Sequence, residues 1–265
     1  MLKSGTKLFD SNNSLNPNKL NYYIYNAFLR NDIEISQDLS NFVSTPNLND
    51  LINYKAVILE KAININATKK VTILSKYKSS PLDIIADFQD GLWTGEKGEM
   101  VSAKVLRNTN FKASNGRLDF TDIAEIDVEV SKLETRTLTC GDILLEKSGG
   151  SPTQPVGRVR LFDVQEDVQY SYSNFCSRIR VFNKDYDSSY IWVMLNEFYM
   201  LGGTVPLQNG VRLLNLKIPE YKKVRIPKPP LEIQQKIATE VLKIYSEEKA
   251  NASELARDVI NNYLL

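Results

Sequence analysis

The 265-residue chain has no histidine and only two cysteines. Without histidine, a Ser-His-Asp triad, a Cys-His pair and a histidine-bound zinc or iron site are excluded. Cys140 and Cys176 are too few and too far apart for a disulfide framework or a cysteine zinc site, so we expect two reduced, partly buried thiols and no bound metal. Any catalysis by this chain would have to depend on carboxylates, lysines or a cofactor.

Other common signatures are missing as well. Apolar runs such as Ile191–Leu195 are far shorter than the roughly 20 residues that span a bilayer, and residues 1–20 lack the apolar core of a signal peptide. We therefore expect a cytoplasmic protein without a membrane partner. The sequence also has no glycine-rich dinucleotide loop and no phosphate-binding loop. The Asn-Pro-Pro-Tyr signature of adenine-N6 methyltransferases is absent too, so we expect no cofactor in this chain.

Positive and negative charges nearly cancel, because 33 basic residues stand against 32 acidic ones. They are unevenly placed along the chain. Between Gly203 and Lys228 the only acid is Glu220, which predicts a local basic surface of the kind that contacts phosphates, or else a solvated charged face. The basic residues of this segment are Arg212, Lys217, Lys222, Lys223, Arg225 and Lys228.

Apolar periodicity divides the chain into three segments. Residues 1–70 show helical spacing at 21–30 and again around 48–63, which predicts a mostly helical N-terminal segment. Residues 71–228 carry short alternating runs separated by turn residues, which predict strands of a mixed or antiparallel sheet. These runs are 101–106, 125–130, 143–145, 156–162 and 177–182. The expected fold class is α+β.

Two helices are expected in the C-terminal half. Tyr190–Leu201 is apolar on most sides and precedes two glycines, which predicts a buried helix with a glycine stop. In the third segment, residues 229–265, a proline-rich junction leads into one long helix from Leu231 to Tyr263 with apolar residues at steps of three and four. We assign assembly to this stripe, through a partner helix or, alternatively, by packing on residues 1–70. Its members include Ile237, Val241, Ile244, Leu255 and Val259.

Three blocks carry a family resemblance. Residues 141–162 read GDILLEKSGGSPTQPVGRVRLF, residues 209–216 read NGVRLLNL, and residues 226–235 read IPKPPLEIQQ. In this order they resemble the target recognition domain of restriction-modification systems, which reads DNA in type I specificity subunits and in fused adenine-N6 methyltransferases. Residues 1–70 look like the linker that joins a methyltransferase core to such a domain in fused enzymes.

The resemblance implies a mixed-sheet target recognition domain at 71–228, sequence-specific binding of double-stranded DNA, and a DNA methyltransferase domain or subunit as partner. It implies a non-catalytic specificity module, with S-adenosylmethionine bound by the partner or a missing domain. Type I specificity subunits usually carry two recognition domains and two long helices, whereas this sequence shows one of each. That departure fits either a half-subunit that forms a homodimer through its C-terminal helix or the C-terminal piece of a fused enzyme.

In such a domain the segment 147–151 (KSGGS) offers small residues that let the backbone approach a phosphate, although two glycines also suit a tight turn. Arg158 and Arg178 suit guanine unless they pair with acids such as Asp142 or Glu146. The expected DNA-binding residues are Lys147, Ser148, Ser151, Arg158, Arg178, Gln208, Asn209, Arg212, Lys222 and Lys223.

Three positions, Gln208, Asn209 and Trp93, each have two interpretations. Gln208 and Asn209 suit adenine edges, or else belong to a capped turn. Trp93, in a glycine-flanked loop, is expected in the core, and the alternative is a wedge against the sugar edge of DNA.

Two rival functions remain open. Glu220 and Lys222 form an E-x-K triplet of the kind that metal-dependent nucleases use, with Asp83 or Asp142 as a second magnesium ligand. The other rival is a structural assembly subunit whose domain has no role on DNA. The sequence does not identify the DNA bases that would be recognised, because target recognition domains vary most in the loops that contact the bases.

Overall fold

The computed structural model describes residues 9–13, 15–35, 52–53, 56–57, 71–93, 98–111, 117–151, 154–165, 168–210, 213–247 and 249–265. The chain divides into two compact units, residues 1–69 and 70–265. Within the described ranges, no helix has the length and apolar character needed to cross a membrane.

The first unit contains helix α1 (Leu20–Phe28) and two short antiparallel strands, β1 (Ile52–Asn53) and β2 (Ala56–Val57). The helix predicted at 21–30 is therefore present. The helix predicted around 48–63 is wrong at the residues of β1 and β2, which contain isoleucine and valine, residues that favour extended backbone. The rest of that stretch lies outside the described residues.

Four antiparallel strands form the central sheet of the second unit. Strand β7 is buried along its whole length, as expected when both faces of a sheet are covered. Its residues alternate between two cores: Ile143 and Leu145 join one cluster, and Leu144 joins another. The strand order is β4 (Ala86–Asp90), β11 (Cys176–Val181), β7 (Ile143–Glu146) and β9 (Val159–Leu161).

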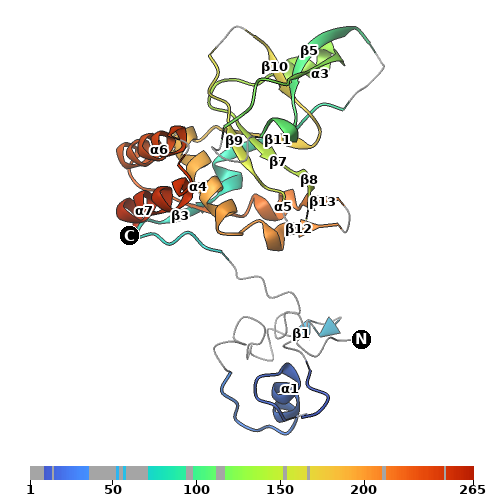
Figure 1. The fold of residues 1–265 in the computed structure, drawn as a ribbon, viewed down its shortest axis with the longest axis vertical. Coiled ribbons are helices and arrows are strands. Elements are labelled where there is room, and N and C mark those ends of the chain that lie inside the picture. The colour runs from blue at the N-terminus through green and yellow to red at the C-terminus, as the bar shows by residue number, and fades with distance from the viewer. Residues whose placement is uncertain are drawn as a thin grey trace. The chain divides into compact units, whose positions relative to one another are not determined.

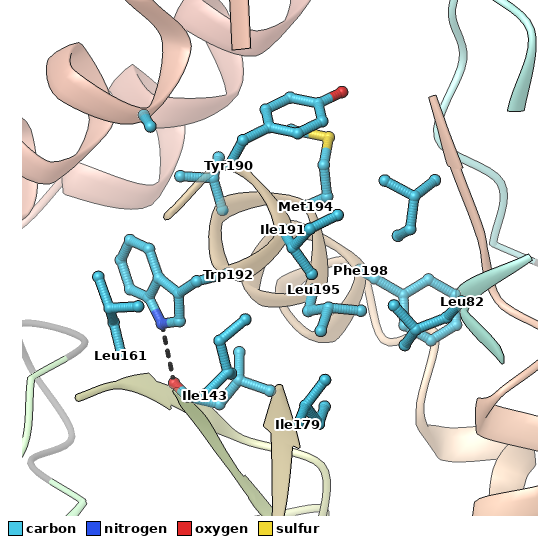
Figure 2. Close-up of a cluster of buried hydrophobic side chains, with 14 of the residues drawn as sticks. Leu82, Ile143, Leu161, Ile179, Tyr190, Ile191, Trp192, Met194, Leu195 and Phe198 are labelled. Atoms are coloured by element: carbon cyan, nitrogen blue, oxygen red, sulfur yellow. Dashed lines mark hydrogen bonds between the residues drawn. The ribbon is translucent and has the colours of Figure 1, made fainter. Parts of the chain in front are cut away.

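Helix α4 (Ser188–Met200) covers one face of this sheet. Its side chains pack onto those of the strands, and the Trp192 indole Nε1 donates a hydrogen bond to the Val159 carbonyl at 3.3 Å (Figure 2). The Asp187 carboxylate accepts from the Tyr190 amide at 2.9 Å and so begins the helix, and Gly202, with φ of +78°, follows its end. This buried helix and its glycine stop confirm the prediction.

A second, three-stranded sheet lies at one end of the unit with helix α3 (Val130–Arg136) (Figure 1). Strand β5 runs parallel to β10 and antiparallel to β6. Each of the five sequence runs predicted as strands contains a strand, and the α+β fold class is confirmed. The strands are β10 (Tyr170–Tyr172), β5 (Met100–Leu106) and β6 (Ala124–Glu129).

Shorter elements complete the second unit. Strand β8 pairs with β13, which pairs with β12, and β14 pairs with β3. The strands are β3 (Ser79–Pro81), β8 (Ser148–Gly150), β12 (Gln208–Asn209), β13 (Leu214–Leu216) and β14 (Arg225–Pro227). The short helices are α5 (Ile218–Tyr221) and the 3₁₀ turns η2 (Leu82–Ile84), η3 (Asn108–Asn110) and η4 (Val205–Leu207).

Two helices, α6 (Leu231–Ser246) and α7 (Ala252–Leu264), stand where the sequence predicts one. The prediction of a single long helix is wrong because residues 246–251, SEEKAN, supply no large apolar side chain to continue the stripe. Glu247 caps α6, and its carboxylate pairs with Lys249 at 2.6 Å, so α6 ends at a polar segment.

The C-terminal apolar stripe is covered within its own unit. α6 and α7 pack against each other and against α4 (Figure 1). Ile237 and Val241 are buried, Ile244 and Val259 are half-buried against the same core, and Leu255 is half-buried. The stripe therefore packs on helices of its own unit, since α7 folds back onto α6, and pairing through it in a homodimer or with another subunit stays a prediction.

Candidate nucleic-acid interface

A groove of about 760 Å³ opens on the second unit where β8, β12 and β13 meet the turn at residues 173–175. We call it the Trp93 groove. It is lined by Trp93, Lys147, Ser148, Asn174, Phe175, Asn209, Leu213, Asn215, Leu216, Lys217, Ile218, Pro219 and Glu220. Three of the residues predicted to bind DNA, Lys147, Ser148 and Asn209, therefore lie in one hollow.

Backbone hydrogen bonds fix the walls of the groove. The amides of Lys147 and Ser148 both donate to the Phe175 carbonyl, at 2.9 and 3.2 Å, and the Leu216 amide donates to the Lys147 carbonyl at 2.8 Å. The junction of β7 and β8 is therefore tied to the 173–175 turn on one side and to β13 on the other. The backbone positions from which the groove side chains project are therefore fixed.

Glycines in the 147–151 segment allow close packing. Gly149 has φ of +106°, and a Cβ there would lie 2.5 Å from the Asn108 amide nitrogen. The chain then reverses at Ser151, whose amide donates to the Gln154 carbonyl at 2.9 Å. Gly149 and Gly150 lie in strand β8, so the tight turn suggested for these two glycines is wrong, and Ser151 lies outside the groove lining.

Lys147 is held at the groove wall by Asp90. Its ammonium lies 2.8 Å from the Asp90 carboxylate, which also accepts from the Ser177 hydroxyl at 2.7 Å. Burial raises the pKa of Asp90, but the hydrogen bonds from Lys147 and Ser177 outweigh it, so the pKa lies below its usual value. The carboxylate thus stays charged near neutral pH and positions the lysine.

Large apolar side chains are exposed in this groove. Trp93 is 69% exposed, Leu213 48% and Phe175 38%. The expectation of a core tryptophan is wrong, because Gly91 and Leu92 pair tightly with the chain at 172–176 and carry the next residue outward. Exposed apolar clusters are typical of surfaces that bind a ligand or a partner.

The groove amides differ in their freedom. Asn215 accepts from the Ser148 hydroxyl at 2.6 Å and donates to the Leu213 carbonyl at 3.3 Å. Gln208, half-buried beside the groove, donates to the Val156 carbonyl at 3.3 Å. Among the described residues, the side chains of Asn174 and Asn209 have no protein hydrogen-bond partner, so both amides can bind a ligand.

The basic segment does not act as one patch. Lys217 is exposed, lines the groove and has no ion-pair partner among the described residues. The Lys222 ammonium lies over the Phe88 ring, 5.0 Å from its centroid, and Lys223 pairs with Glu220 at 2.9 Å. Neither lysine lines the groove. Arg212 lies outside the described residues.

The two arginines predicted to read guanine are held in ion pairs. Arg158 makes two contacts of 2.8 Å to Glu146 and donates to the carbonyls of Phe111 and Asn108. Arg178 pairs with Asp87 at 3.2 Å and is 5% exposed. These partners correspond to the structural alternative, in which strand arginines pair with acids.

Two of the three carboxylates considered for a nuclease site, Asp142 and Glu220, are paired with basic side chains. Asp142 accepts from Arg180 at 2.7 Å, and Glu220 pairs with Lys223. Across the described ranges no group of three or more histidine, cysteine, aspartate or glutamate side chains is arranged to hold a metal ion. Of the two free thiols, Cys140 is exposed and Cys176 is buried, which raises the pKa of Cys176 to about 12.

Sequence reasoning missed several groove residues. Asn174, Phe175 and Asn215 carried no local signal, and Lys217 appeared only in the charge count of its segment. They converge through the pairing of β8 with β13 and of the 173–175 turn with Leu92. Such long-range pairings have no local signature.

Comparison with known protein families gives a match within the second unit. The family model described as type I restriction modification DNA specificity domain matches residues 96–255. No curated protein matches the chain. Among solved structures, the chain is similar to the type I restriction-modification S subunit from M. genitalium, with 13% identity and a TM-score of 0.43 over 68% of this chain and 42% of that one.

The HsdS subunit from Thermoanaerobacter tengcongensis is also similar, with 12% identity and a TM-score of 0.41 over 74% of this chain and 47% of that one. The chain spans less than half the length of these solved structures. The family model, in contrast, covers more than half of the chain, including β5, the central strands β7, β9 and β11, and α6. The chain belongs to the family of type I restriction-modification DNA specificity domains.

Proposed function

We propose that residues 70–265 read a sequence in double-stranded DNA for a restriction-modification system and that the Trp93 groove is the contact surface. The observation that carries this proposal is the meeting of lysines, unpaired amides and exposed aromatic rings in one groove of a specificity-domain family member. Lysines suit phosphates, and amides suit base edges. The groove thus offers both positioning and base-reading groups.

The roles divide by position. Lys217 contacts a phosphate, because its side chain is exposed and unpaired within the described part of the chain. Asn174 and Asn209 contact base edges, with adenine favoured because an amide can both accept from N6 and donate to N7. Arg158 holds the fold beneath the groove, because its donors are occupied by protein acceptors.

The chain contributes specificity, and its partners contribute chemistry. A DNA methyltransferase subunit or domain binds S-adenosylmethionine and modifies the DNA site that this module selects. The associated nuclease is directed by the same recognised site. The support is family membership, together with the absence from the sequence of a methyltransferase signature and a cofactor loop. Methyl transfer from S-adenosylmethionine to DNA by the isolated chain would overturn this division.

The decisive experiment maps modified sites in cells that carry the intact system with wild-type chain, Asn209→Ala or Asn262→Ala. Asn262 is an exposed amide on α7, outside the groove, and is the matched control. Asn209→Ala should relax the preference at one base pair, since one good amide–base contact is worth about 1–3 kcal/mol of discrimination. Identical site preferences in all three would exclude Asn209 from base reading.

Binding by the purified full chain tests the wider proposal. Fluorescence anisotropy should show selective binding to duplexes that contain the mapped site, with affinity that falls as salt rises. A chain that binds no duplex selectively at any salt concentration would instead be a structural assembly subunit.

A further inference from the structure

Trp93 lines a second, smaller hollow next to the groove. This apolar slot has a volume of about 220 Å³. Leu92, Val105 and Val128 are almost fully buried and Ile126 is half-buried, so its floor is aliphatic. Its full lining is Leu92, Trp93, Val105, Ile126, Val128, Ser173 and Asn174.

The backbone beside the slot is fixed at several points. The Leu92 amide donates to the Tyr172 carbonyl at 2.8 Å, and the Leu92 carbonyl accepts from the Asn174 amide at 3.0 Å. A Cβ on Gly91 would lie 2.1 Å from the Ser173 carbonyl oxygen, so only glycine permits this approach. Trp93 therefore extends from a braced backbone, and a ligand that stacks on it meets a preorganised surface.

Size and chemistry narrow the ligand. The slot is smaller than the roughly 300–1,000 Å³ of pockets that take drug-sized ligands, so it suits a single small ring system. Aliphatic walls and an indole favour a flat ring, and the unpaired Asn174 amide can bond to a polar ring edge. A nucleobase has both a flat apolar face and a hydrogen-bonding edge.

The position of the slot supplies the connection to DNA. Trp93 and Asn174 line both the groove and the slot. A strand whose phosphates lie along the groove lysines can therefore present one base past Trp93 into the slot. Among the described residues, no others line both hollows.

We propose that the apolar slot binds one unstacked nucleobase of the DNA held in the Trp93 groove, with Trp93 as the stacking wall and Asn174 as the edge contact. This inference rests on the proposed function. Taking a base out of the duplex stack costs least where that base is already unpaired. A duplex with one extra, bulged base should therefore bind more tightly than a matched duplex.

The test uses the full chain and two duplexes of the same sequence, one matched and one with a single bulged 2-aminopurine. By anisotropy, the bulged duplex should bind at least about tenfold more tightly, the ratio that one stacked base supplies. The 2-aminopurine emission should fall on binding, because the ring stacks on Trp93. Equal affinity for both duplexes would overturn the slot and leave DNA recognition intact.

Variants separate the slot from general binding. Trp93→Ala should remove the preference for the bulge, and Trp93→Phe should retain most of it. Ile126→Phe fills the slot and should remove the preference while matched-duplex binding persists. Phe182→Ala removes another exposed aromatic ring, 58% exposed against 69% for Trp93, that lies outside both hollows, and it should change neither binding nor the preference. A preference that survives Trp93→Ala would refute the slot, and failure to bind either duplex would refute both proposals.

Discussion

Arg158 and Glu146 face each other through two contacts of 2.8 Å, and their side chains are only 11% and 2% exposed. Burial lowers the pKa of Arg158, but the hydrogen bond and charge of Glu146 raise it above its usual value. Arg158 also donates to the Phe111 and Asn108 carbonyls, so it joins the central sheet to residues 108–111. The pair therefore stabilises the frame beneath the groove.

Arg158→Ala should lower the free energy of unfolding by about 3–5 kcal/mol, because it leaves a buried carboxylate without its partner. Urea denaturation measures this loss. Lys236→Ala, which breaks an exposed pair with Glu232, is the control and should have no measurable effect. A folded Arg158→Ala protein with unchanged stability and altered base preference would restore the guanine-reading role expected from the sequence.

Acid should release Lys147 from Asp90. The folded-state pKa of Asp90 is lowered from its usual value of 3.8, so its contribution to stability is present above that value and is lost as the pH falls through the folded-state pKa. The effect is small, below about 1 kcal/mol, because the Asp90 side chain is 63% exposed. Melting temperatures of wild type and Asp90→Asn should differ at neutral pH and converge below pH 3.8. A gap of the same size at every pH would exclude this linkage.

Lysine substitutions distinguish the groove from the basic segment as a whole. Lys217→Ala should reduce the slope of log K against log salt by about 0.9, the value for one phosphate contact on duplex DNA. The sequence assigns the same role to Lys222 and Lys223, but their contacts with Phe88 and Glu220 predict a smaller effect for Lys222→Ala with Lys223→Ala. Anisotropy titrations over a range of salt concentrations measure both slopes. A larger change in the double variant would place the phosphate contacts on the segment outside the groove.

Because the C-terminal apolar stripe is covered within its own unit, substitutions in it should reduce stability. In an exposed stripe they would instead reduce association with a partner. Ile237 is fully buried between α6 and its neighbours, so Ile237→Ala should cost about 2–5 kcal/mol. Leu231→Ala, at a position 44% exposed, should cost far less. Urea denaturation measures stability, and sedimentation measures the oligomeric state. If the Ile237→Ala protein kept its stability and lost only self-association, the prediction that the C-terminal helices pair between copies of the chain would be supported instead.

Local patterns were sufficient for much of the fold. Period-two alternation located strands such as β5 and β11, and the apolar run before Gly202 located α4. The predictions were wrong where contacts with segments distant in the sequence determine the local structure. Helix α6 ends at Ser246 and α7 packs against α4. The periodicity of apolar residues along one helix carries no information about such a distant packing surface.

The candidate site was less accessible to sequence reasoning. Lys147, Ser148 and Asn209 were predicted from residue type, but their meeting depends on the pairing of β8 with β13. Trp93 could not be placed, because a tryptophan between small residues suits a core as well as a surface. Its exposure follows from the contact of Gly91 with the turn at 173, more than eighty residues away.

The crowding at Gly91 also bears on how this domain could be given a new target. Because the Ser173 carbonyl excludes even a methyl group at position 91, the main chain there cannot be rebuilt by substitution without loss of the frame. The side chains of Trp93, Asn174 and Asn209 border open space and carry little of the packing. If these side chains read the target as proposed, we expect combinatorial replacement at the three positions to change the target while the backbone and the stability of the fold stay unaltered.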